Sequence, residues 1–434
     1  MNHSVIIAIV VFAATYVAIG MEKIHRTTVA ISGALLLMIF GVLDMKEAIG
    51  FISWETIGLL LGMFCIVSAL SESGFFTYLA LVLARRLNYD PVRILVVFPI
   101  VTGVLACFMD SITVMLFFAT LTFELARLLK VDPVPLVVAE VCLANTGGSA
   151  TLVGDPPNVI LGTMLGYNFN DFVANTGPIA LVAGAASVLY FYLQFRGKMR
   201  SSQPVDRAEL DRLDPAGAIK DPKTMKMGLA AFGIAILFLI VHPFVEHAGI
   251  PLTVPMAALL PAFGLLVLGG RRTEIVLHKV EYEVLLFFMG LFIVVGGLEK
   301  TGVIRYLAEG VAVLFEGNHI GLIAALVWGS GISSAVVDNV PFALTMAYVI
   351  KDLAATSGAM ALSMMVWAVA MGTDIGGNFT PIGASANVVA YNSLEKKGIT
   401  IGWIRWIKLA VPCTVVALLI STVMLIAKYL IRFY

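Results

Sequence analysis

The sequence LANTGGSATLVGDPPNVILG, residues 143–162, lies in a strongly apolar region of the chain and interrupts it. It holds two adjacent glycines, two adjacent prolines, an aspartate and two asparagines. A continuous lipid-facing helix does not use these residues, because they break its hydrogen bonds and lipid cannot satisfy the freed polar groups. The stretch therefore predicts a broken helix whose neighbour is something other than lipid.

The composition predicts a polytopic membrane protein. Of the 434 residues, 60% are hydrophobic and 13% are charged, which is far more apolar than a soluble globular protein. The first apolar segment has no small-residue cleavage site, so we expect a retained span and not a removable signal. The four cysteines show no CxxC spacing and no clustered histidines, which argues against a soft-metal site and a disulfide framework.

We predict an all-α fold of ten crossings, five in each half of the chain. Residues 92–129 and 319–350 are expected as re-entrant hairpins, and residues 134–166 and 362–394 as broken helices. The other apolar segments are expected to cross once each, and they are 4–20, 27–43, 55–71, 172–195, 227–243, 252–269, 283–298 and 408–427.

The basic residues predict the orientation of this layout in the cell membrane. With the N-terminus outside, 22 of the 28 lysines and arginines fall on the cytoplasmic side, as the positive-inside rule requires. The C-terminus is then also outside. The longest polar stretch, residues 196–226, is predicted to be a cytoplasmic linker between a first repeat, residues 1–195, and a second repeat, residues 227–434.

An internal repeat supports the division into two halves. Residues 54–74 align with residues 282–302 at an offset of 228, and the same offset carries Asp110 onto Asp338. An offset of 229 carries Gly147, Gly148, Thr151, Gly154 and Asn158 onto Gly376, Gly377, Thr380, Gly383 and Asn387. With five crossings per half the second copy must be inverted. Inverted repeats with interrupted helices point to a secondary transporter with a site near the membrane midplane.

Each break has the parts of an ion site. Gly147–Gly148 and Gly376–Gly377 can end a half-helix and leave carbonyls for a cation, whereas Pro156–Pro157 can start a half-helix whose amide end suits an anion. Asn158 and Asn387 follow in the first turns, where an amide offers a donor or an acceptor. Either charge sign stays open, and the alternative is that these residues only cap and pack a kinked helix.

Acidic residues occupy the predicted hairpin tips. Asp110 is followed by Ser111 and Thr113, and Asp338 by Asn339. An ionisable side chain at the bilayer centre costs about 2.5–3.5 kcal/mol on insertion scales, so its paired occurrence indicates use in ion binding or proton relay. The alternative is that each aspartate caps its hairpin through backbone amides. Glu140, inside the apolar run before the first break, also needs a partner or a proton.

Two further aspartates break the symmetry of the halves. Asp155 aligns with Ala384, and Asp374 aligns with Asn145. We therefore expect ion coordination in one half, protonation in the other, and a bound ion off the pseudo-two-fold axis. The candidate substrate- and ion-binding residues are Asp110, Ser111, Thr113, Asn145, Thr146, Gly147, Gly148, Asp155, Asn158, Asp338, Asn339, Asp374, Gly376, Gly377, Thr380, Ser385 and Asn387, and the candidate sodium ligands are Asp110, Asn145, Asp338 and Asp374.

Several enzyme motifs are missing from the chain. No GxxxxGK[ST] loop is present, so the chain is not expected to hydrolyse nucleotide itself. No GxSxG motif, HExxH motif or Cys/His cluster is present either. We expect a protein that is not an enzyme, that needs no cofactor, and that couples to H+ or Na+.

The stretches NTGGSATLVGDPPNVILG (145–162), MDSITVMLFF (109–118) and GGNFTPIGASANVVAY (376–391) resemble the ArsB/NhaD permeases of the ion transporter superfamily. The branch that includes the melanosomal P protein is the most similar, and the likeness extends to KIHRTTVAISGALLL (23–37) and SWETIGLLLGMF (53–64). The resemblance implies two inverted repeats that form a scaffold domain and a transport domain, an elevator-type movement, a homodimer and a separate ATPase subunit.

Related divalent-anion symporters carry a Ser-Asn-Thr triplet at each hairpin tip, where this chain has Asp110-Ser111-Ile112-Thr113 and Asp338-Asn339-Val340-Pro341. The extra carboxylates would repel a dianion unless sodium or protons intervened. Our leading hypothesis is therefore proton-coupled efflux of arsenite or antimonite, because arsenite is mostly a neutral hydroxide at pH 7. A sodium/proton antiporter is the alternative, and transport of an inorganic anion or dicarboxylate comes third.

Hypotheses outside secondary transport are weaker. A passive channel needs no duplicated closed site, and a structural or receptor role leaves the buried acids unexplained. The expected partners are membrane lipid, a small inorganic ion and a second copy of the chain, with no nucleic acid.

Overall fold

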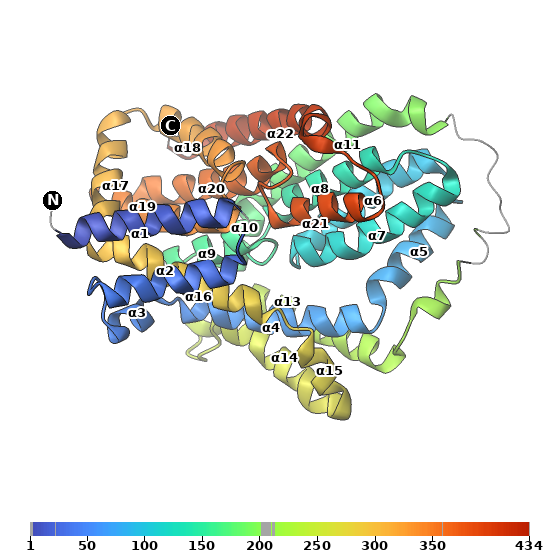
Figure 1. Cartoon of the computed structure of the whole chain (residues 1–434), viewed down its shortest axis with the longest axis horizontal. Coiled ribbons are helices and arrows are strands. Elements are labelled where there is room, and N and C mark those ends of the chain that lie inside the picture. The colour runs from blue at the N-terminus through green and yellow to red at the C-terminus, as the bar shows by residue number, and fades with distance from the viewer. Residues whose placement is uncertain (1–2, 22, 201–209, 211–212, 358, 434) are drawn as a thin grey trace.

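The computed structural model is all-helical over the residues that it describes, which are 3–21, 23–200, 210, 213–357 and 359–433. Most helices run along the long axis of the molecule, and both ends of the chain lie toward the left in Figure 1. The helices of residues 1–200 are α1 His3–Gly20, α2 Arg26–Ile39, α3 Met45–Phe51, α4 Trp54–Glu72, α5 Phe75–Arg86, α6 Pro91–Ala106, α7 Ser111–Leu129, α8 Pro133–Gly148, α9 Pro156–Leu165, α10 Phe169–Asn175 and α11 Gly177–Arg200.

The rest of the chain forms a second series of helices. They are η1 Ala216–Ala218, α13 Pro222–His247, α14 Val254–Gly269, η2 Gly270–Arg272, α15 Thr273–His278, α16 Tyr282–Lys300, α17 Val303–Leu314, α18 His319–Ser334, α19 Asn339–Ser357, α20 Ala359–Gly376, η3 Gly377–Phe379, α21 Ser385–Lys396 and α22 Gly402–Phe433. The predicted linker, 196–226, is narrower than expected, because α11 continues to Arg200 and α13 begins at Pro222. Its residues 201–209 and 211–212 lie outside the described residues.

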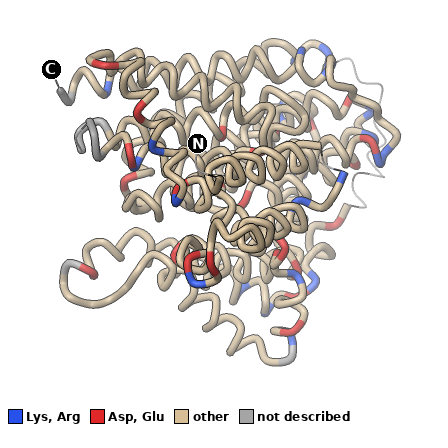
Figure 2. The backbone as a smooth tube through the Cα atoms, turned by 60° about the vertical axis from the view of Figure 1, so that its left-hand side comes forward, with Lys and Arg blue, Asp and Glu red and all other residues tan. Residues whose placement is uncertain are grey.

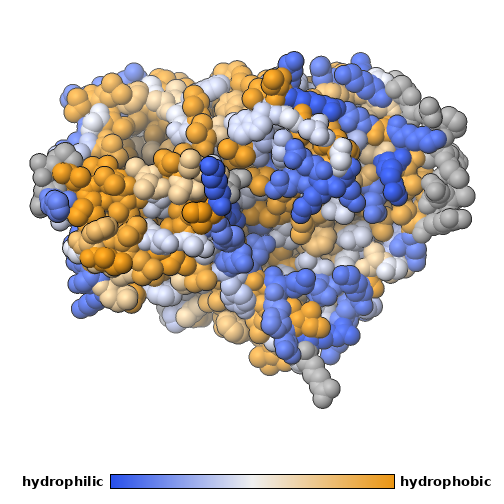
Figure 3. All heavy atoms as spheres, in the orientation of Figure 1, coloured by the Kyte–Doolittle hydropathy of each residue, from blue (hydrophilic) through white to orange (hydrophobic). Residues whose placement is uncertain are grey.

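Length and composition make the fold that of a multi-pass membrane protein. Seven described helices are long and apolar enough to span a bilayer, namely α1, α4, α7, α11, α13, α16 and α22. Shorter apolar helices accompany them, among them α2, α6, α14 and α18. Figure 3 shows hydrophobic atoms gathered over α1 at the left of the molecule and hydrophilic atoms gathered toward the right. Charged segments of the backbone also concentrate at helix ends (Figure 2).

The helix order repeats at the offset seen in the sequence. Corresponding helices begin 228 residues apart, namely α2 and α14, α3 and α15, α4 and α16, α5 and α17, α6 and α18, and α7 and α19. Four members of this series, α3, α5, α15 and α17, were not predicted. All four are too short to have the apolar length of a span, and α5 ends in Arg85 and Arg86. The repeated order supports duplication, and the inverted orientation of the second copy stays a prediction.

Figure 1 shows two layers of helices. In the lower layer, helices of opposite halves pair, because α2 packs against α16 and α4 packs against α14. In the upper layer, α6 packs against α8 and α18 against α20, and each hairpin arm meets the restarted helix of the other half, α7 against α21 and α19 against α9. Neither half can therefore complete its own packing without the other.

Glycines allow the closest helix crossings of the upper layer. A Cβ atom on Gly147 would lie 2.1 Å from the carbonyl oxygen of Gly103, where α8 crosses α6. A Cβ atom on Gly376 would lie 2.1 Å from the Cα atom of Gly331, where α20 crosses α18. The same pair of glycines thus occurs in both halves. Each crossing lets a hairpin lie directly against the broken helix that follows it.

We expect Gly147→Ala and Gly376→Ala each to destabilise the folded protein by about 1–3 kcal/mol, because a methyl group would force two backbones apart. The measurement is the unfolding temperature of the purified protein in detergent. Gly329→Ala on α18 is the matched control, since a Cβ atom there meets nothing within 4 Å. An equal loss in the control would show that the loss does not come from the close helix crossings.

Candidate functional site

The two predicted helix breaks are present. α8 ends at Gly148 and α9 begins at Pro156. In the second half α20 ends at Gly376, and α21 begins at Ser385 after one turn of 3₁₀ helix. The first break is buried and the second is mostly buried, so their polar groups must find partners inside the protein.

An asparagine closes each break. Asn158 Nδ2 donates to the carbonyl oxygens of Gly148 at 2.9 Å and Thr151 at 3.1 Å. Asn387 Nδ2 donates to the carbonyl oxygens of Gly377 at 2.9 Å and Thr380 at 2.8 Å. These carbonyls, expected to be free for a cation, are therefore already hydrogen-bonded. Each asparagine uses both of its amide hydrogens, so its side-chain orientation is fixed.

The hairpin-tip aspartates have different partners. Asp110 is the N-cap of α7, and it accepts a hydrogen bond from the backbone N–H of Thr113 at 3.0 Å. Asp338 accepts from the backbone N–H of Val340 at 3.2 Å and forms an ion pair with Arg26 at 3.3 Å. The capping alternative is thus present at both tips. At Asp338 it coexists with a charge partner from a distant part of the chain.

Asp155 connects the two hairpin tips. Its Oδ1 atom accepts from the hydroxyl of Ser111 at 3.0 Å, and its Oδ2 atom accepts from the side-chain amide of Asn339 at 2.9 Å. Ser111 is the first residue of α7 and Asn339 is the first residue of α19. Asp155 is 3% exposed, so these two donors replace the water that its carboxylate would otherwise bind. One buried carboxylate therefore holds residues from both halves.

A second buried carboxyl group lies beside it. Asp374, on α20, is fully buried, and Asp155 and Asn158 are the side chains next to its carboxyl group. Neither of its oxygens has a hydrogen-bond donor. Its counterpart in the first half, Asn145, donates from Nδ2 to the Oδ1 atoms of Asn387 and Asn378, both at 2.8 Å. The sequence asymmetry of the two halves thus lies at the centre of the site.

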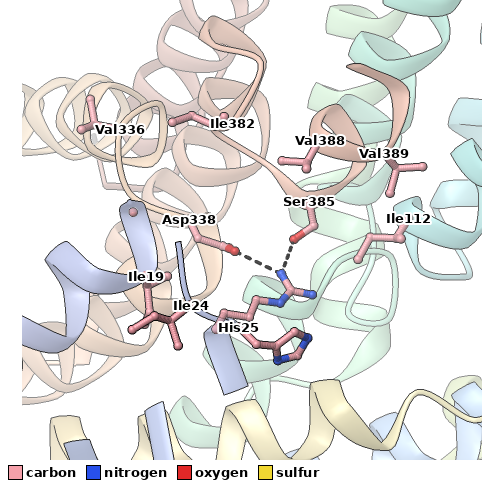
Figure 4. Close-up of a pocket in the computed structure, with 12 residues that line it drawn as sticks. Ile19, Ile24, His25, Ile112, Val336, Asp338, Ile382, Ser385, Val388 and Val389 are labelled. Carbon is pink, nitrogen blue, oxygen red and sulfur yellow. Dashed lines mark hydrogen bonds and ion pairs between the residues drawn. The ribbon is translucent and has the colours of Figure 1, made fainter. Parts of the chain in front are cut away.

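A cavity of about 310 Å³ opens beside the second hairpin tip. Arg26, the first residue of α2, extends into it from the lower layer. Its guanidinium group donates to Asp338 and, at 2.8 Å, to the hydroxyl of Ser385 (Figure 4). It also lies over the ring of Phe287, 5.2 Å from the centroid. Arg26 therefore links the two layers beside the second hairpin tip.

The other candidate residues are distributed around this centre. The hydroxyl of Thr146 bonds within its own helix to the carbonyl of Cys142, and that of Thr380 bonds to the carbonyl of Ala335. Three of the four candidate sodium ligands, Asp110, Asn145 and Asp338, have separate partners, and Asp374 has no hydrogen-bond partner. Among the described residues, no group of three or more His, Cys, Asp or Glu side chains is arranged to hold a metal ion. Sodium binding stays a prediction.

Two residues of the site were not among the candidates. Arg26 was counted as a loop cation, and its only sequence signal is its place in KIHRTT, one of the stretches that carry the family resemblance. Asn378 lies inside the second break, and its counterpart in the first break is Ser149. Glu140 is buried and accepts a hydrogen bond from Thr122, while its Oε2 atom has no donor. It is bonded to α7 and not to the two central aspartates.

Comparison with known proteins gives a consistent result. The family model described as citrate transporter matches residues 16–372. An uncharacterized transporter of Mycobacterium tuberculosis is 34% identical over 431 residues, which cover 98% of this chain and 99% of the relative. The human P protein is 30% identical over 98% of this chain, but the match covers only 60% of that longer protein.

A solved structure shares the fold. The crystal structure of the YdaH transporter of Alcanivorax borkumensis superposes with a TM-score of 0.59 and covers 98% of both chains. The sequence identity is 15%, so this likeness concerns the arrangement of the helices and not the identity of what is bound.

We expect Ser111→Ala and Asn339→Ala to weaken the same carboxylate site, each by about 1.5–3 kcal/mol, because each removes a hydrogen bond to a charged group. Hydrogen exchange of the backbone amides at the first turns of α7 and α19 is the measurement. Asp155→Ala should increase exchange at both tips at once. Thr120→Ala, which removes an exposed hydroxyl bonded within α7, is the control. Faster exchange at only one tip would show that Asp155 does not connect them.

Proposed function

The chain belongs to the citrate transporter family, and from the geometry of its site we propose that it couples the efflux of arsenite or antimonite to protons by an elevator-type movement. As a member of that family it is a multi-pass secondary transporter and not an enzyme. The family membership leaves the substrate, the coupling ion and the direction of transport open.

The observation that carries the proposal is the buried Asp155–Asp374 pair between the hairpin tips. Two carboxylates buried side by side without a cation repel each other, so such a pair holds a proton or binds a cation. A site of this kind can link proton movement to the arrangement of the hairpins, because Asp155 is bonded to both of them.

Charge favours a neutral substrate. Arg26 is the basic side chain that the described structure brings to the hairpin tips, and it is already paired with Asp338. Arsenite is mostly a neutral hydroxide near pH 7, so acidic side chains would not repel it, and Asp and Asn can hydrogen-bond its hydroxyl groups. The sodium/proton antiporter stays an alternative, with sodium in place of a proton between the two aspartates.

A carboxylate or inorganic anion is the second candidate substrate. Two observations favour it. One is the description of the matching family, and the other is the position of the Arg26 guanidinium group beside Ser385, the first residue of α21. A helix N-terminus and a guanidinium group both attract anions. An anion would have to displace Asp338 from Arg26, or bind while that aspartate is neutralised.

An elevator movement requires a contact between the two layers that can break. Arg26 provides such a contact to Asp338 and Ser385. Tyr16 provides another from α1, which packs against α2 and α16, by donating to the carbonyl oxygen of Pro341 at 2.7 Å. We propose that the lower layer is a scaffold, that the upper layer moves, that the two halves are inverted copies and that both termini are outside. A homodimer and a separate ATPase subunit are further proposals that rest on the family resemblance.

The flux of the purified protein in liposomes tests the function. With an imposed pH gradient we expect arsenite to accumulate against its own gradient, and a protonophore to abolish the accumulation. Citrate, other dicarboxylates, phosphate, chloride, sodium and lithium are measured in parallel. Accumulation of citrate alone would replace arsenite with the second candidate. If none of these ions moves against a gradient, the proposed function is wrong.

Breaking the contact between layers should alter turnover. We expect Arg26→Gln and Asp338→Asn to change the rate of arsenite flux by similar factors, corresponding to about 1–2 kcal/mol for a partly exposed pair. The double variant should change the flux rate little more than either single variant does, because each of the three variants breaks the same ion pair. Arg305→Gln is the control, since its ion pair with Glu309 lies within one exposed helix. Additive effects would show that Arg26 and Asp338 act separately.

A further inference from the structure

Asp374 is a buried acid without a donor. It lies on α20, its side chain is fully buried, and both carboxyl oxygens have no hydrogen-bond partner. Buried carboxylates are normally paired with a cation or receive several hydrogen bonds, as Asp155 does nearby. Asp374 has neither, so an ionised form of this side chain is unsatisfied where it stands.

The opposite half shows what the position requires. Asn145 occupies the corresponding place, and its Nδ2 atom donates to Asn387 Oδ1 at 2.8 Å. Asn387 in turn donates both amide hydrogens to the carbonyls of its own helix break. An amide hydrogen of Asn145, on the broken helix of the first half, is therefore donated to the side-chain oxygen of Asn387, which closes the break of the second half.

In the first break the corresponding acceptor, Asn158 Oδ1, has no hydrogen-bond donor. Asn158 donates both amide hydrogens to the carbonyls of Gly148 and Thr151, so its Oδ1 atom cannot turn away. That Oδ1 atom is buried and has no donor. The repeat places Asp374 where Asn145 lies and Asn158 where Asn387 lies, so Asn158 Oδ1 corresponds to the atom that Asn145 reaches in the other half. An ionised Asp374 would place one acceptor against another, whereas a carboxylic acid would supply the missing hydrogen.

We propose that Asp374 carries the coupling proton, with its O–H group donating to Asn158 Oδ1 in the place that a permanent amide hydrogen of Asn145 fills in the other half. This inference rests on the proposed proton-coupled function and assigns its proton to one residue. Loss of the proton would leave Asp374 facing an acceptor and a second carboxylate. Asp374 would then move away from Asn158 and Asp155. A shift of Asp155 would in turn move the hairpin tips, because Asp155 is hydrogen-bonded to Ser111 and Asn339.

The surroundings of Asp374 favour this assignment. α20 packs against α8, α9, α18, α19 and α22. Of the described charged groups on these elements, Asp155, the N-cap of α9, is the one whose negative charge would repel an ionised Asp374. The tip aspartates Asp110 and Asp338 would repel an ionised Asp155 instead. Because Asp155 already receives two donors, from Ser111 and Asn339, the proton of the pair belongs on Asp374.

The test uses Asp374→Asn in the full-length protein. Asparagine supplies a permanent donor at the same place, as Asn145 does, so we expect a folded protein that melts at or above the temperature of the unchanged protein. In liposomes it should exchange arsenite across the membrane but no longer accumulate it when a pH gradient is imposed. Glu140→Gln is the matched control, because it removes a buried carboxyl group that is bonded to α7 and not to the two central aspartates.

Two further variants separate a proton site from a merely structural role. Asp374→Ala leaves Asn158 without a donor and should melt at a lower temperature than Asp374→Asn. The double variant Asn145→Asp and Asp374→Asn moves the titratable group to the opposite half, and it should regain gradient-driven accumulation. If Asp374→Asn still accumulates arsenite as well as the unchanged protein does, the proposal is wrong.

An infrared measurement separates this inference from the proposed function. The unchanged protein should show a protonated-carboxyl band that Asp374→Asn lacks and Glu140→Gln keeps, whether or not arsenite is transported. If the band is assigned in this way but no arsenite moves, the proton site stands and the substrate is wrong. If arsenite moves with protons and the band is unaffected by Asp374→Asn, the coupling proton lies elsewhere. Accumulation driven by sodium in place of protons would also overturn the proposal.

Discussion

The structure depends on the need to satisfy one buried carboxylate. Asp155 follows a broken helix in an apolar interior, where water cannot reach it. Its two oxygens are satisfied by Ser111 from the first hairpin and Asn339 from the second. Because the two donors come from opposite halves of the chain, the hairpins must meet at the break. The position of the site follows from this requirement.

Close packing makes that meeting geometrically possible. Helix breaks and hairpins can approach only where side chains are absent, and Gly147 with Gly103 and Gly376 with Gly331 supply two such crossings. The freed backbone carbonyls are then satisfied internally by Asn158 and Asn387. Irregular backbone at membrane depth is tolerated on these terms, since its polar groups have partners within the protein. The breaks are therefore stable parts of the fold.

The two layers of the molecule are held together differently from the site itself. Within the upper layer the central contacts are buried hydrogen bonds, whereas Arg26 reaches Asp338 from the lower layer at a cavity and is partly exposed. Partly exposed ion pairs contribute less to stability than fully buried hydrogen bonds to charge. The weaker contact is thus located between the layers, where a transport movement would need to break it, and the stronger contacts lie inside the layer that we propose to move.

The sequence by itself determined the membrane character, the two helix breaks, the two hairpins with their aspartate tips and the repeat at an offset of 228, because each is a pattern of neighbouring residues or a constant spacing. It did not reveal the short helices α3, α5, α15 and α17, or the use of Asn158 to close its own loop. Only the tertiary structure decided that Asp155 binds both tips, that Arg26 belongs to the site, and that Asp374 faces Asn158. These contacts join residues that lie far apart in the chain, 184 positions for Asp155 and Asn339 and 312 for Arg26 and Asp338. Such pairs follow from how the two halves pack, which no local pattern encodes.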